Sequence, residues 1–163
     1  MLVELISRLF LKLKIIIHKV INAPVYKNGV ILYGVPRMIY RERITLGKNV
    51  KINEQVFLHG AGGIIIGENC TLSYGTVIVS TQYDTSHWIE QSFVPEPNHI
   101  EEEVTIGQNV WIGANSTILP GVSIADNCII AAGSVVAKSL TEPNTLYAGV
   151  PAKAIKKLHS FYN

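Results

Sequence analysis

The chain carries five histidines, and histidine is the side chain best suited to exchange a proton near neutral pH. His18 and His159 lie in the terminal segments and are most simply surface residues. His59 and His87 fall in the middle of the chain, and Asp84 stands three residues before His87. A carboxylate at that spacing could hold one ring nitrogen of His87 and stabilise the imidazolium. These residues could supply general acid–base chemistry, with His87 and His59 as candidates for the base.

The elements that must position these histidines follow from an aliphatic residue at every sixth position. The positions are Leu46, Ile52 and Leu58, then Ile66, Leu72 and Ile78, then Ile100, Ile106, Ile112, Ile118, Ile124, Ile130 and Val136. A helix repeats its apolar face every three or four residues and a half-buried strand every two, so a period of six is neither. It predicts an all-β solenoid, in which each hexad gives one strand and one turn, three hexads close a coil, and stacked coils bury the core.

The repeat has one large interruption. After the hexad at Ile78 the next should begin at residue 84, but the pattern resumes at Ile100. Residues 84–99 are therefore expected to leave the coil as a loop, and loops positioned by a rigid scaffold often carry function. Asp84 and His87 both fall in this loop, which is long enough to reach a neighbouring subunit.

The two cysteines are expected to be structural. Cys70 and Cys128 stand four positions after the aliphatic residue of their hexads, where small or β-branched side chains point inward, so both are predicted to be buried thiols. Neither suggests a disulfide or a metal site, and the five histidines lack the close grouping that a zinc ion needs. Free thiols fit a reducing cytoplasm.

Residues 1–43 precede the repeat. In residues 1–21 apolar side chains recur at nearly helical spacing, but Glu4, Arg8, Lys12 and Lys14 interrupt any membrane span and any signal-peptide core. Two interpretations remain open. The helix either packs on the coil or a neighbouring subunit, or lies as a basic amphipathic helix on the inner face of a membrane.

Composition indicates one compact domain. The 163 residues are 48% apolar and 16% charged, which suits a single core. The net charge of +2 and the lack of basic runs with interleaved aromatics argue against nucleic acid. We expect the solenoid over residues 44–158, ending in an extended segment and a short helix, with a tail at 159–163.

The segment "IGQNVWIGANSTILPGVSIADNCIIAAGSVV", followed by "AGVPAKAIKKL", resembles the hexapeptide-repeat acyltransferases. The likeness is greatest to the galactoside, maltose and xenobiotic acetyltransferase branch and its polysaccharide O-acetyltransferase relatives, over about residues 44–158. The resemblance implies a left-handed parallel β-helix, a homotrimer, acetyl-CoA as donor, and a sugar or glycan hydroxyl as acceptor.

The resemblance also implies roles for particular residues. His87 follows the same strand as the family's catalytic histidine, and Asp84 would orient it. The donor site would comprise Ala114, Ala132, Ala137, Lys138, Lys153 and Lys156. Ala137 stands where relatives often carry Thr, and the last two lysines replace frequent arginines, so they would bind phosphates as point charges.

Two other functions stay open at the level of sequence. An amino-sugar N-acetyltransferase would share the fold and the donor. A non-catalytic structural solenoid would share the fold alone, because the same repeat also builds purely structural coils.

Overall fold

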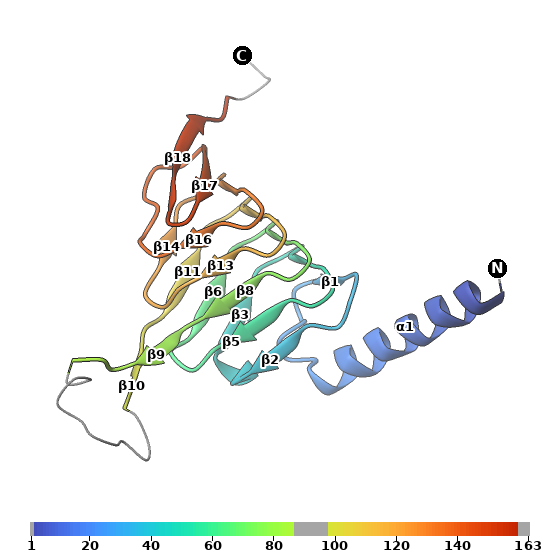
Figure 1. Ribbon diagram of the computed structural model, residues 1–163. Coiled ribbons are helices and arrows are strands. Elements are labelled where there is room, and N and C mark those ends of the chain that lie inside the picture. The colour runs from blue at the N-terminus through green and yellow to red at the C-terminus, as the bar shows by residue number, and fades with distance from the viewer. Residues whose placement is uncertain (1, 87–97, 160–163) are drawn as a thin grey trace.

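The computed structural model describes residues 2–86 and 98–159. From Ile31 onward the chain winds into a three-sided β-solenoid of about five turns, shown in Figure 1. In chain order the elements are α1 (Leu2–Ile21), β1 (Ile31–Leu32), β2 (Arg37–Ile39), the 3-10 helix η1 (Arg41–Arg43), β3 (Ile44–Leu46), β4 (Lys51–Ile52), β5 (Phe57–His59), β6 (Ile64–Ile66), β7 (Thr71–Leu72), β8 (Val77–Val79), β9 (Thr81–Tyr83), β10 (His99–Glu101), β11 (Val104–Ile106), β12 (Trp111–Ile112), β13 (Thr117–Ile118), β14 (Ser123–Ile124), β15 (Ile129–Ile130), β16 (Val135–Val136), β17 (Thr145–Gly149) and β18 (Ala152–Lys157).

Each side of the solenoid is one sheet of stacked strands, all parallel apart from β18. The first sheet has the order β1-β4-β7-β12-β15-β17-β18, the second β16-β13-β8-β5-β2, and the third β14-β11-β6-β3. Successive coils are in register, so that equivalent residues lie directly above one another, as Leu58 does with Ile78. The expected β-solenoid is confirmed.

The core is a column of aliphatic side chains with smaller ones beside it. The sixth-position residues from Leu46 to Val136 are almost completely buried, apart from Ile100, and so are the small residues two positions before them, such as Thr76 and Ser116. Stacking is what buries them, because a single coil leaves both of its apolar faces open. Ile100 was predicted to point inward, but it lies in β10 with 39% of its surface exposed. The buried six-residue repeat resumes at Val104.

One corner of the solenoid is a ladder of asparagines. Asn49, Asn69, Asn109 and Asn127 all adopt left-handed backbone conformations with φ between 54° and 59°, which asparagine tolerates better than most residues. The Asn49 side chain donates to Asn69 Oδ1 at 3.1 Å, and Asn109 donates to Asn127 Oδ1 at 3.0 Å. The ladder fixes the turn and links successive coils.

The solenoid begins two strands earlier than the sequence pattern indicated. Strands β1 and β2 pair with β4 and β5, although the expected boundary lay at residue 44. Val25 and Tyr26 are buried at the open end of the first coil. The segment between α1 and β1 therefore covers the N-terminal end of the core.

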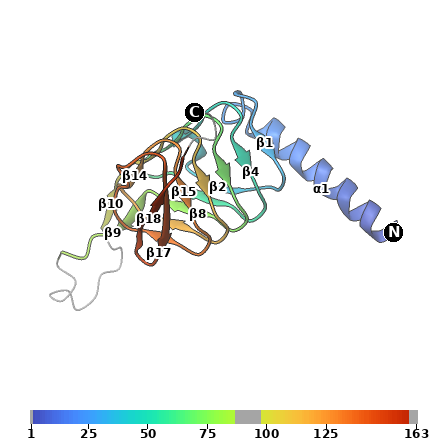
Figure 2. The same cartoon turned by 90° about the horizontal axis from the view of Figure 1, so that it is seen from above.

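Helix α1 leaves the solenoid at that end and extends away from it in both Figure 1 and Figure 2. Within the described part of the chain, no helix is both long enough and apolar enough to cross a membrane. Ten large apolar side chains of α1 are 44% to 80% exposed, and they form what we call the exposed apolar face: Val3, Leu5, Ile6, Leu9, Phe10, Leu13, Ile16, Ile17, Val20 and Ile21.

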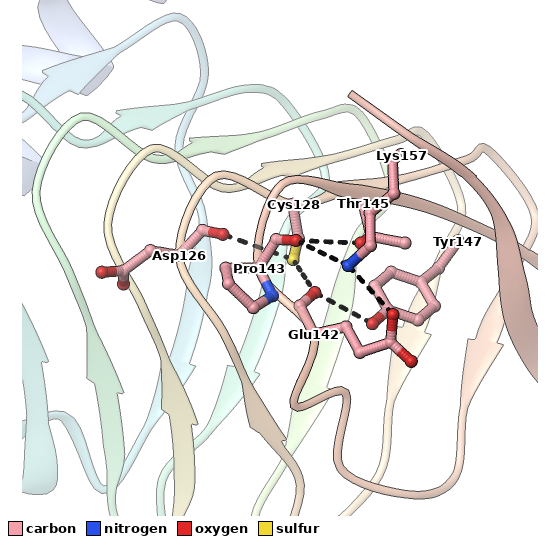
Figure 3. Close-up of polar contacts among 7 residues, drawn as sticks. All are labelled: Asp126, Cys128, Glu142, Pro143, Thr145, Tyr147 and Lys157. Carbon is pink, nitrogen blue, oxygen red and sulfur yellow. Dashed lines mark hydrogen bonds and ion pairs between the residues drawn. The ribbon is translucent and has the colours of Figure 1, made fainter. Parts of the chain in front are cut away.

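At the other end, the segment expected to contain a short helix forms a strand instead. β18 pairs antiparallel with β17, the last strand stacked on the first sheet. Figure 3 shows Glu142 at the centre of this cap: its carbonyl oxygen accepts from the Tyr147 hydroxyl at 3.0 Å, and its carboxylate lies 2.9 Å from Lys157 Nζ. The helical spacing was overridden because the open edge of β17 supplies backbone partners for an extended chain.

Candidate active site

Two of the residues matched to the donor site, Ala114 and Ala132, lie at one corner between the first and second sheets, which we call the alanine corner. Ala114 lies between β12 and β13, and Ala132 holds the equivalent place one coil later, between β15 and β16. The backbone N–H of Gly133 donates to the Ala114 carbonyl at 2.8 Å. Ala114 is half-buried and Ala132 is exposed. Methyl side chains leave the backbone of this corner open to a ligand that lies along the coil.

The C-terminal hairpin joins the same corner. The backbone N–H of Gly149 donates to Ser134 Oγ at 3.2 Å, two residues after Ala132. Lys153 pairs with Ala148 near the turn of the hairpin and is exposed. The structure thus brings the turn that precedes Lys153 next to the alanine corner, where an ammonium group could bind a phosphate.

The other expected donor residues lie farther along the same elements. Ala137 and Lys138 follow β16, at the opposite end of that strand from Ala132, and both are exposed. Lys156 is exposed and pairs with Leu146, toward the far end of the hairpin. A ligand contacting all six residues would have to extend across both the first and the second sheet.

The segment that interrupts the six-residue repeat begins and ends as a two-stranded arm. β9 and β10 pair antiparallel, with Gln82 opposite Ile100, and carry the chain away from the coil. Asp84 continues the pairing, since its backbone N–H donates to the Asn98 carbonyl at 2.8 Å. Its carboxylate is half-buried and accepts from the Ser86 backbone N–H at 2.9 Å. His87, the residue expected to act as base, lies outside the described residues.

His59 lies on the coil at the root of this arm. Its carbonyl oxygen accepts from both the backbone N–H and the hydroxyl of Ser80, the last coil residue before β9. The ring is half-buried against the edges of Tyr40, at 5.5 Å between centroids, and Phe57, at 6.2 Å. Within the described residues, the buried Nδ1 of His59 has no hydrogen-bond partner. Tyr40 gave no sequence signal because it precedes the recognised repeat.

Both cysteine thiols are buried, and neither can act as a nucleophile in this environment. Burial raises the pKa of the Cys70 thiol to about 11 and raises the pKa of Cys128 as well. A protonated, inaccessible thiol is unreactive. Among residues 2–86 and 98–159, no three His, Cys, Asp or Glu side chains are grouped to hold a metal ion.

A hollow of about 250 Å³ lies elsewhere, at the N-terminal end of the coil. Pro24, Arg41 and Leu46 are among the residues that line it. It belongs to the first coil, whereas the alanine corner belongs to the fourth and fifth. The hollow therefore does not coincide with the candidate donor residues.

Comparison with known proteins identifies the family. The model "Bacterial transferase hexapeptide (six repeats)" matches residues 103–138, and "Hexapeptide repeat of succinyl-transferase" matches residues 45–80. The maltose O-acetyltransferase from Clostridium difficile 630 is 31% identical, with a TM-score of 0.69, over 80% of this chain and 67% of that one. The chain belongs to the hexapeptide-repeat acetyltransferases.

Other members of the hexapeptide-repeat acetyltransferases bear on the site. A galactoside acetyltransferase in complex with coenzyme A has a TM-score of 0.70 at 28% identity, over 82% of this chain and 69% of that one. A relative in Escherichia coli (strain K12), named "Putative lipopolysaccharide biosynthesis O-acetyl transferase WbbJ", is 35% identical over 70% of this chain and 60% of its own length. This chain therefore spans less than two thirds of that relative.

Proposed function

We propose that the protein transfers an acetyl group from acetyl-CoA to a hydroxyl of a sugar, in a cell-surface polysaccharide or its precursor. The observation that carries this proposal is the alanine corner in a chain of this family, with small residues in register on two coils and the turn before Lys153 beside them. The pantetheine arm would lie along this corner, and Lys153 and Lys156 would attract the nucleotide phosphates. Ala137 and Lys138 would extend the same groove.

His87 would act as the general base in the transfer. It takes the proton of the sugar hydroxyl while the oxygen attacks the acetyl carbonyl carbon, so that a C–O bond forms. The C–S bond of the thioester then breaks, and the protonated histidine returns its proton to the CoA thiolate. Asp84 would hold the imidazole through its other nitrogen. No covalent enzyme intermediate is required.

We further propose that three copies of the chain assemble into a homotrimer, with each site lying between two neighbouring coils. The alanine corner lies on the outer surface of one solenoid, so a neighbouring coil would supply the second wall of a donor groove. The arm that begins at β9 extends away from its own coil and could reach the neighbour's corner. The two free, buried cysteines fit a reducing cytoplasm, where lipid-linked glycan precursors would be met at the inner face of the membrane.

A thiol-release assay tests the proposal. The protein is incubated with acetyl-CoA and a panel of sugars, amino sugars and purified glycans, and the products are analysed by mass spectrometry. We expect thiol release that depends on the acceptor, with an O-acetylated sugar as the product. N-acetylated product would assign the amino-sugar alternative. No release with any acceptor, together with no acetyl-CoA binding in calorimetry, would indicate a structural solenoid.

A further inference from the structure

Helix α1 is attached to the solenoid by the face opposite its exposed apolar face. His18 Nε2 lies 2.8 Å from the Tyr26 hydroxyl, Lys19 Nζ donates to the Val30 carbonyl at 2.7 Å, and Ile15 packs partly buried against the core. With 3.6 residues per turn, the ten residues of the exposed apolar face fill an arc of about 160°, and these three contacts lie outside it. A helix that packed on its own coil would bury its apolar face, whereas all ten side chains of this face are at least 44% exposed. Only its edge at Ile17 and Ile21 borders the coil, where these residues line a hollow with Val35.

The charges of α1 are arranged around that face. Lys12 and Lys14 border the apolar arc on its two sides, while Glu4 lies in the middle of the opposite face and pairs with Arg8 at 2.6 Å. The helix holds four of the 14 Lys and Arg residues but one of the 12 Asp and Glu residues, so the rest of the chain is close to neutral. Lysines at the two borders can lay their alkyl stems along an apolar phase while the ammonium groups reach its polar boundary.

We propose that α1 binds the surface of a lipid bilayer rich in anionic headgroups, with its axis parallel to the surface and its exposed apolar face among the acyl chains. The breadth of the apolar arc and its basic borders are the pattern of interfacial helices. A second copy of the chain could also cover apolar side chains, but it gives no reason for basic residues on both borders. This inference goes beyond acetyl transfer and does not depend on it.

The test is co-sedimentation of the full chain with lipid vesicles, without acetyl-CoA or acceptor. Vesicles contain phosphatidylcholine alone, or phosphatidylcholine with about 30% phosphatidylglycerol, which supplies the negative surface potential. We expect at least about tenfold tighter binding to the anionic vesicles, weakened by about 0.5 M salt. No binding of the wild-type protein to anionic vesicles would overturn the proposal, whatever the thiol-release assay gives.

Two double variants separate the apolar and charge contributions. Leu9→Glu with Leu13→Glu should abolish binding to both vesicle types. Lys12→Gln with Lys14→Gln should weaken binding to anionic vesicles by about tenfold or more, at about 1 kcal/mol for each lysine near the surface.

Lys48→Gln with Lys51→Gln is the matched control, because it removes the same charge from two exposed coil lysines. It should bind anionic vesicles like the wild type, and an equal loss would overturn the proposal in favour of unspecific attraction. Sedimentation velocity of the leucine variant tests the alternative, in which a second copy of the chain covers the exposed apolar face. If the wild type does not bind vesicles and the leucine variant changes its oligomeric state, the apolar face would be assigned to contact with a second copy of the chain.

Discussion

Gly133 and Ala114 join two successive coils through a single backbone hydrogen bond of 2.8 Å at the corner proposed to bind acetyl-CoA. Just before this corner the two coils approach closely, since a Cβ added to Gly113 would lie 2.5 Å from the backbone nitrogen of Ala132, whereas one added to Gly133 would meet no atom within 4 Å. The inner side of the corner is therefore closely packed, and its outer side is open. A ligand lying on it meets backbone and methyl groups, which makes the corner sensitive to any larger side chain.

Replacing Ala132 with tyrosine should block the donor site. Ala132 is exposed, so the ring fits without disturbing the core, but it covers the surface on which the pantetheine arm would lie. We expect the KM for acetyl-CoA to rise at least about tenfold, equivalent to about 1.4 kcal/mol of binding. The measurement is thiol release, with calorimetry for the affinity. Ser123→Tyr, on an exposed position of the third sheet, is the control and should behave like the wild type. Unchanged acetyl-CoA affinity in Ala132→Tyr would remove the corner from the donor site.

Replacing Asn109 tests the asparagine ladder. Alanine loses the hydrogen bond to Asn127 Oδ1 and must adopt a left-handed conformation at φ 54°. The two losses of about 1 kcal/mol each should lower the free energy of unfolding by roughly 2 kcal/mol. Asn109→Gly keeps the backbone conformation accessible and should lose about half as much. Urea unfolding measures both, and equal losses in the two variants would show that the left-handed conformation carries no cost.

The repeating part of the fold was predictable because its signal is local. Within each block of the repeat every sixth residue points inward, apart from Ile100, and burial of that residue is the same requirement in each coil. The first coil was missed because its corner around Tyr40 and η1 departs from the six-residue spacing before Ile44. The last strand was missed because the open edge of β17 decides its conformation, and that edge exists only after the coils have stacked.

The candidate site was predictable in part for the same reason. The motifs place Ala114 and Ala132 one coil apart at the same corner, and register follows from the repeat. The hydrogen bond from Gly149 to Ser134 Oγ depends on how the hairpin folds back, which no spacing reveals. The orientation of α1 was also beyond the sequence, because only the contacts of His18 and Lys19 show which side of the helix meets the coil.

His18 should make stability depend on pH. Burial lowers its pKa from the ordinary value of 6.5, and the nearby charge of Arg41 lowers it further. The unfolded chain then binds the proton more readily than the folded one, so stability is complete above pH 6.5 and is lost as the pH falls toward the lowered folded pKa. The melting temperature of the wild type should therefore fall more steeply below pH 6.5 than that of His18→Gln. Parallel curves for the two proteins would contradict the assignment.

His87→Ala should impair the chemical step alone. The residue falls outside the six-residue repeat and outside the donor motifs, so melting temperature and acetyl-CoA affinity should stay close to those of the wild type. A general base contributes on the order of 10² to 10⁴ in rate, which corresponds to about 3 to 5 kcal/mol of barrier. A loss of kcat in that range, measured by thiol release with one confirmed acceptor, is the expected result.

His59→Ala is the decisive companion to that variant. The His59 ring contacts Tyr40 and Phe57 at the root of the arm, and its Nδ1 is buried without a partner within the described residues. Its removal should lower kcat less than His87→Ala does, because we expect His59 to shape the surface beside the arm. If His87 were only a solvated loop residue, its removal would change kcat by less than about threefold, since surface substitutions shift energies by about 0.5 kcal/mol. Near-normal turnover in folded His87→Ala, with His59→Ala inactive, would move the base from the arm to the coil.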